Sequence, residues 1–161
     1  MSLPGDLDTA ISNDSTNGSG CARSVRVLLA DDHQPILDRV ASLVSGEFTV
    51  VAAVNDGGEA VSAAARLQPD VLVLDISMPD VNGLEAAVRA KEAGSTAAVV
   101  FLTVHHEPEF LEAAWAAGAL GYVRKSHLAS DLIPAIRAAV DGRRFVSASL
   151  DAENGSQPLQ S

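Results

Sequence analysis

The sequence predicts an α/β protein, a three-layer sandwich in which helices cover both faces of a five-stranded parallel sheet. Five short apolar runs alternate with five stretches whose apolar residues recur at helical spacing. The third run, residues 71–74, has no polar alternation, as expected of a strand that is buried on both faces. With 161 residues, 47% of them hydrophobic, the chain is suited to one globular core. The alternation favours parallel strands that are joined by right-handed crossovers.

The elements follow one another in a regular order. The apolar runs predict strands at residues 25–30, 48–54, 71–74, 97–102 and 120–123. Apolar stripes predict helices around residues 36–44, 60–67, 84–88, 110–117 and 132–140. Gly118 and Gly142 follow the last two helices, in the position where glycine commonly ends a helix. Pro134 fits the last helix if Ser130 is its N-cap, because proline then lies in the first turn, where its missing N–H costs no bond.

The two ends of the chain lack this patterning. Residues 1–24 are dominated by small and polar residues, and we expect a disordered N-terminal tail there. Residues 148–161 predict a second disordered tail, which leaves a single domain over residues 25–147. The single cysteine, Cys21, excludes an intrachain disulfide.

Composition excludes several classes of function. The net charge is −10 and no basic cluster occurs, so direct DNA binding by this chain is not expected. The sequence has no apolar run long enough for a membrane span, and residues 1–24 hold no apolar run of signal-peptide length. We therefore expect no membrane association and a cytoplasmic location.

Polar residues follow four of the predicted strands. Asp31 and Asp32 follow the first strand, Asp75 the third, Thr103 the fourth and Lys125 the fifth. Because ligands bind beyond the carboxyl ends of parallel strands, these side chains should converge at one edge. Three nearby carboxylates repel one another unless a cation enters, and Mg²⁺ (or Mn²⁺) prefers oxygen ligands. A cation beside a carboxylate also prepares it for attack on a phosphoryl group. Any one of these residues could be a simple turn former, but the set of five predicts phosphoryl chemistry.

The same residues stand in recognisable motifs. These are LLADDH at residues 28–33, VLDISMPDVNG at 73–83, LT at 102–103 and GALGYVRK at 118–125. In order and spacing they resemble the receiver domain of bacterial two-component response regulators, over residues 25 to about 147. The resemblance is strongest to the receivers of LuxR/FixJ-type regulators, and it implies a flavodoxin-like topology.

The resemblance implies a role for each residue of the site. Asp75 would be the phosphoacceptor, and Lys125 would pair with a phosphoryl oxygen. Asp31, Asp32, Asp75 and the backbone carbonyl of Ser77 would hold Mg²⁺. Pro79 and Gly83, in the segment after Asp75, are expected to be architectural.

The resemblance also implies a switch. Thr103 would bind a phosphoryl oxygen and move toward it, while Tyr122, at the aromatic switch position, would turn inward. The surface of the fourth helix, fifth strand and fifth helix would then change its preferred partner, and the resemblance allows a homodimer through this surface. We hypothesise that Leu111 and Trp115 form a partly exposed patch on it; the alternative is that Trp115 only covers the edge of the core.

The resulting function is that of a signalling module rather than an ordinary enzyme. It would accept phosphate from a histidine kinase or a phosphotransfer protein and dephosphorylate itself slowly. Two alternatives stay open: an aspartyl-phosphate hydrolase, against which the Ser at position 77 counts, and a phosphorylation-independent interaction module. His105 either gates water attack or is a solvated loop residue. Residues 148–161 are too few for an output domain, so we expect either a stand-alone receiver or a truncated regulator.

Overall fold

The computed structural model of the protein describes residues 24–104 and 108–147. Both predicted tails, apart from Ser24, lie outside the described residues, and so do Cys21 and His105.

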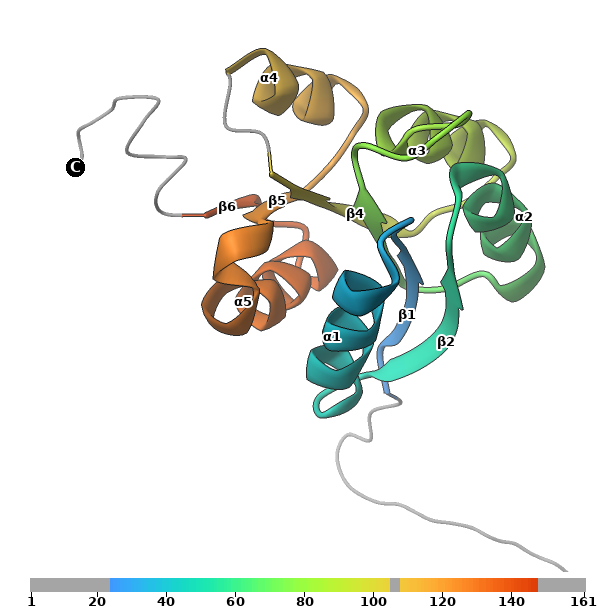
Figure 1. Cartoon of the computed structure of the whole chain (residues 1–161). Coiled ribbons are helices and arrows are strands. Elements are labelled where there is room, and N and C mark those ends of the chain that lie inside the picture. The colour runs from blue at the N-terminus through green and yellow to red at the C-terminus, as the bar shows by residue number, and fades with distance from the viewer. Residues whose placement is uncertain (1–23, 105–107, 148–161) are drawn as a thin grey trace, which may run out of the picture.

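In the described part of the chain, helices cover both faces of one parallel sheet (Figure 1). The sheet has six strands in the order β2-β1-β3-β4-β5-β6, and every neighbouring pair is parallel. The strands are β1 (Arg26–Ala30), β2 (Thr49–Val54), β3 (Val71–Asp75), β4 (Ala98–Thr103), β5 (Gly121–Arg124) and β6 (Phe145–Val146). The helices are α1 (Gln34–Ser45), α2 (Gly57–Leu67), α3 (Gly83–Glu92), α4 (Pro108–Ala116) and α5 (Leu128–Val140).

Each face of the sheet has its own core. On one face, alanines of α2, α3 and α4 pack against Leu28, Leu72 and Phe101. On the other, leucines and valines of α1 and α5 pack against Val27 and Val73. Because alternate residues of each strand point to opposite faces, the fully apolar runs of β1, β3 and β4 fill both cores.

The predicted number of strands was wrong, because the sheet contains a sixth. After α5 the chain turns back along β5, and the N–H of Phe145 donates to the carbonyl of Leu120 at 2.8 Å. The N–H of Ser147 donates to the carbonyl of Tyr122 at 3.0 Å. A strand of two residues has no periodicity to read, whereas the open edge of β5 supplies hydrogen-bonding partners for it.

The predicted N-cap of the last helix was also wrong. Helix α5 begins at Leu128 with His127 as N-cap, so that Pro134 lies inside the helix. Leu128 is buried and joins the core beneath α5, which draws the helix start one turn earlier than expected. The hydroxyl of Ser130 donates to the carbonyl of His127 at 3.3 Å instead of capping the helix. Tertiary packing of Leu128 therefore outweighs the local preference of proline for a first turn.

The two predicted glycine C-terminal positions are confirmed. Gly118 and Gly142 have φ values of 91° and 78°. The N–H of Ala119 bonds to the carbonyl of Ala114 at 3.0 Å, and the N–H of Arg143 bonds to that of Ala138 at 2.8 Å. These turns end α4 and α5 and direct the chain back to the sheet, into β5 and β6 respectively.

Candidate functional site

The carboxyl ends of β1, β3, β4 and β5 bring the predicted polar residues to one edge of the sheet. Asp31 and Asp75 are 1% and 3% exposed, and Thr103, at the end of β4, is 1% exposed. Asp32 is exposed beside them. One carboxylate oxygen from each of the three aspartates lies within 4.8 Å of the other two. The convergence that was predicted from strand order is therefore present for the three carboxylates.

Local backbone turns orient the two buried carboxylates. Asp31 Oδ1 accepts the N–H of His33 at 2.8 Å, and Asp75 Oδ1 accepts the N–H of Ser77 at 3.2 Å. Both are side-chain bonds to the amide two residues on, a common device where a strand passes into a loop. Ser77 itself is exposed. These two bonds thus hold the carboxylates of Asp31 and Asp75 at the edge of the sheet, where β1 and β3 end.

The ammonium of Lys125 lies between the two buried carboxylates. Its Nζ is 2.9 Å from Asp31 Oδ2 and 3.2 Å from Asp75 Oδ1, and the lysine side chain is only 13% exposed. Lys125 opens a short 3₁₀ turn directly after β5, which sets it opposite β3 and β1. One ammonium faces three carboxylates, so the cluster keeps an excess of negative charge. An all-oxygen cluster of this charge suits a hard divalent cation such as Mg²⁺.

The electrostatics single out Asp75. Burial, together with the charge of Asp31, raises the pKa of the Asp75 carboxyl from 3.8 to about 7, although Lys125 and the N–H of Ser77 act in the opposite direction. Burial and the neighbouring charge of Asp31 thus both disfavour the ionised form of the Asp75 carboxyl. A divalent cation at the cluster would favour the ionised form, which is the nucleophilic one.

Close backbone packing fixes the loop that follows Asp75. A Cβ atom at Gly83 would overlap the carbonyl oxygen of Asp75, so the architectural role predicted for Gly83 is confirmed. A Cβ atom at Gly57 would overlap the carbonyl oxygen of Val81, which places the start of α2 directly against the same loop. The contact between Gly57 and Val81 was not predicted from the sequence. The signal for it in the sequence is the Gly-Gly pair that opens α2.

The predicted switch and surface residues lie beside the site rather than in it. Tyr122 is fully buried on the same face of the sheet as α4. Leu111 and Trp115 are both half-buried and pack against that core. The guanidinium of Arg144 lies 4.7 Å from the centre of the Trp115 ring, a cation–π contact that the sequence did not indicate.

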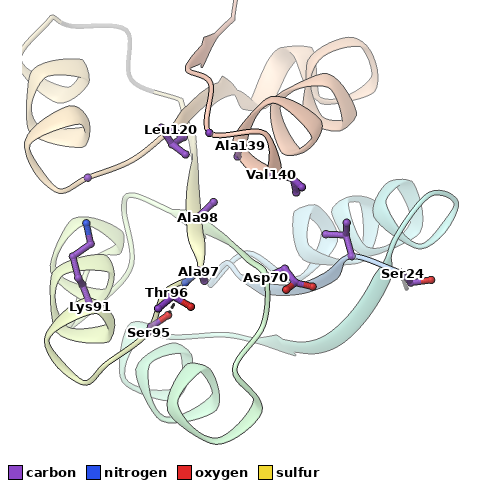
Figure 2. Close-up of a pocket in the computed structure, with 13 residues that line it drawn as sticks. Ser24, Asp70, Lys91, Ser95, Thr96, Ala97, Ala98, Leu120, Ala139 and Val140 are labelled. Atoms are coloured by element: carbon purple, nitrogen blue, oxygen red, sulfur yellow. Dashed lines mark hydrogen bonds between the residues drawn. The ribbon is translucent and has the colours of Figure 1, made fainter. Parts of the chain in front are cut away.

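A cavity of about 590 Å³ lies at the opposite end of the sheet, where the strands begin (Figure 2). Lys91, Asp70 and Thr96 contribute polar groups to its lining, and Leu120 and Val140 contribute apolar ones. None of the predicted site residues lines it. The carboxylate cluster is therefore an open rim of polar side chains and not part of this cavity.

The chain matches the response regulator receiver domain family over residues 27–137. It is 37% identical over 128 residues to an uncharacterized transcriptional regulatory protein, YvfU, of Bacillus subtilis, with 78% of this chain and 64% of that protein covered. It is 32% identical to the nitrate/nitrite response regulator NarL of Escherichia coli, with 77% of this chain and 58% of that protein covered. The chain thus spans about three fifths of these relatives, and the prediction of no direct DNA binding concerns this chain alone.

Solved structures agree with the sequence relatives. A two-component response regulator of the LuxR family from Aurantimonas sp. superposes with a TM-score of 0.77 at 32% identity, covering 81% of this chain and 95% of that one. The signal receiver domain of a putative response regulator NarL from Mycobacterium tuberculosis superposes with a TM-score of 0.72 at 28% identity, covering 76% and 100%. The predicted flavodoxin-like topology is confirmed, with the sixth strand added. In the described parts of the chain, no helix is both long and apolar enough to cross a bilayer.

Proposed function

This chain belongs to the response regulator receiver domain family of two-component systems, and on that premise we propose that it accepts a phosphoryl group on Asp75 in an Mg²⁺-dependent reaction. The donor is a histidine kinase or a phosphotransfer protein. One observation carries the proposal: the carboxylate of Asp75 is buried, lies beside two further aspartates and contacts a lysine ammonium.

In the proposed transfer, a carboxylate oxygen of Asp75 attacks the phosphorus atom of a phosphohistidine donor. A bond forms between that oxygen and phosphorus, the bond between phosphorus and the donor nitrogen breaks, and the imidazole keeps the released electron pair. The product is an acyl phosphate on Asp75. Asp31, Asp32, Asp75 and the carbonyl of Ser77 would hold Mg²⁺, which would supply positive charge to offset that of the phosphoryl oxygens.

Lys125 and Thr103 are placed to hold the remaining phosphoryl oxygens. The Lys125 ammonium contacts Asp75 already, so a short movement would bring it to an oxygen bound to phosphorus. Thr103 is buried at the end of the neighbouring strand β4 and offers a hydroxyl. Both groups would act by charge-assisted hydrogen bonds to the transferred group.

We further propose that the new charge changes the surface formed by α4, β5 and α5. Phosphorylation adds roughly −1.5 to −2 charges at Asp75, and Thr103 and Lys125 respond from the ends of β4 and β5. The buried orientation of Tyr122 would be one of the two positions of the switch. Leu111 and Trp115, half-buried on α4, would then contact a partner or a second copy of the chain.

The test is phosphorylation by acetyl phosphate with and without Mg²⁺, measured by intact mass. We expect an Mg²⁺-dependent phosphoryl adduct on the unaltered protein and none on Asp75→Asn. Asp80→Asn is the matched control, because it makes the same chemical change at an exposed aspartate of the same loop. Failure of the unaltered protein to form the adduct under any condition would favour a phosphorylation-independent interaction module.

A further inference from the structure

The segment that follows α5 is joined to β5 by a buried serine, Ser147. Among the described residues, four polar or charged residues are classed as buried. Three of them, Asp31, Asp75 and Thr103, belong to the candidate site. The fourth is Ser147, the residue that follows β6, and it is fully buried. Buried hydroxyl groups are normally hydrogen-bonded, so the partners of Ser147 show what holds this segment in place.

Ser147 bonds to β5 on both sides of Val123. Its N–H donates to the carbonyl of Tyr122 at 3.0 Å, and its Oγ accepts the N–H of Arg124 at 3.0 Å. Lys125, which follows Arg124 directly, contacts Asp75. Ser147 is thus hydrogen-bonded to the proposed switch residue Tyr122 and to Arg124, whose neighbour Lys125 forms an ion pair with the proposed phosphorylation site.

A second contact ties the same segment to α4. Arg144, two residues before the end of β6, lies over the ring of Trp115. Val146 packs on the core face that contains Tyr122, while Phe145 packs on the α5 side. The segment 144–147 is therefore held by β5 through hydrogen bonds and by α4 through a cation–π contact.

From these contacts we infer that the segment 144–147 acts as a latch. It is held against β5 and α4 in the unphosphorylated protein, and it is released from them when Asp75 is phosphorylated. The inference rests on the proposed function. One set of contacts joins the segment to β5 and the other joins it to α4. A switch that moves one of these elements against the other must weaken at least one set, and β6, with two residues, has few bonds to retain it.

Beryllofluoride with Mg²⁺, which imitates a phosphoryl group on a carboxylate, provides the probe. On the full chain we expect it to raise amide hydrogen exchange of residues 145–147 about fivefold or more, the low end of the usual range for coupled sites. Emission from Trp115, the only tryptophan, should change at the same time. The core strand β3 serves as an internal reference for exchange.

Variants test the coupling from the other side. Arg144→Gln removes the cation over Trp115, and Ser147→Ala removes the acceptor for Arg124. Because coupling between two sites is reciprocal, both variants should bind beryllofluoride more tightly, by about fivefold. Arg143→Gln is the matched control, since it makes the same change in charge at an exposed arginine that pairs with Asp141, and it should bind as the unaltered protein does.

The outcomes separate this inference from the proposed function. Normal beryllofluoride binding with unchanged or slowed exchange at residues 145–147 would overturn the latch and leave the proposed function standing. Equal tightening in Arg143→Gln would also overturn it, because charge alone would then explain the effect. Absence of beryllofluoride binding to the unaltered protein would overturn both.

Discussion

Replacing Asp75 by Asn should stabilise the metal-free protein, and the gain should depend on pH. The carboxyl of Asp75 is buried and its pKa is raised from 3.8 to about 7, chiefly by burial and then by the charge of Asp31. A carboxyl whose pKa is higher in the folded than in the unfolded state favours folding only while it stays protonated. Its contribution is complete below the unfolded pKa and is lost as the pH rises through about 7.

The size of the effect follows from the difference between the two pKa values. Each pKa unit corresponds to about 1.4 kcal/mol, so relative to a pH below 3.8 the raised pKa of Asp75 lowers the free energy of unfolding by about 4 kcal/mol near pH 8 and by about 2 kcal/mol near pH 5. Because the residue is 3% exposed, solvent screens little of this cost. The amide of the variant is also a buried polar group, so we expect a net gain of about 2–4 kcal/mol near pH 8.

The assay is urea unfolding with a chelator present, at pH 5 and pH 8, for the unaltered protein, Asp75→Asn and the exposed-site control Asp80→Asn. The free energy of unfolding of Asp75→Asn should exceed that of the unaltered protein, and by more at pH 8. If the two proteins are equally stable at pH 8, or if the gain is the same at both pH values, the cluster does not impose the cost that we assign to it.

Mg²⁺ supplies an independent check of the same reasoning. A cation that binds only the folded state stabilises it by RT ln(1 + [Mg²⁺]/Kd). The unaltered protein should therefore regain stability as Mg²⁺ is added at pH 8, whereas Asp75→Asn, which lacks one of the proposed carboxylate ligands, should gain much less. An equal response of the two proteins would place the cation elsewhere.

Three further changes test other parts of the structure. Gly57→Ala should lower the free energy of unfolding, measured by urea titration, by about 2–4 kcal/mol, because the new methyl group overlaps the carbonyl of Val81. Gly58→Ala is the control: its methyl group meets only an oxygen of Asp56 at 3.4 Å, and the change should be neutral or slightly stabilising in the same titration. Pro134→Ala should raise the free energy of unfolding by about 1–3 kcal/mol, and with it the melting temperature, since it restores an N–H inside α5. An unchanged or lower melting temperature would contradict the placement of proline within the helix. Lys125→Met should bind Mg²⁺ about tenfold more tightly in calorimetry, because the ammonium repels an incoming cation, and weaker binding would show that the lysine instead assembles the site.

Most of the fold could be predicted because its signals are local and repeated. Apolar periodicity located the five helices and the first five strands, and the glycines at 118 and 142 marked two helix ends. The approach of Asp31 and Asp75 was also predictable, because the order of parallel strands places both residues at one edge. The match was thus best where a residue's position depends only on the element that carries it.

The features that were missed depend on contacts between distant segments. Strand β6 is defined by the edge of β5 and not by its own two residues. The early start of α5 depends on burial of Leu128, and the cation–π pair joins residues 115 and 144, which are separated in the sequence by the whole of α5. The raised pKa of Asp75 results from the combined burial and charge of the folded site. None of these has a signature within a short window of sequence.

The sixth strand also makes the two edges of the sheet unequal in their tendency to aggregate. At one edge, β6 is two residues long and follows Arg143 and Arg144, and short, charged edges resist pairing with another molecule. At the other edge, among the described residues, β2 pairs only with β1 and runs for six residues, TVVAAV, without a charge. Self-association of a weakened or concentrated preparation should therefore begin by strand addition at β2, and a lysine placed at the exposed Thr49 should suppress it.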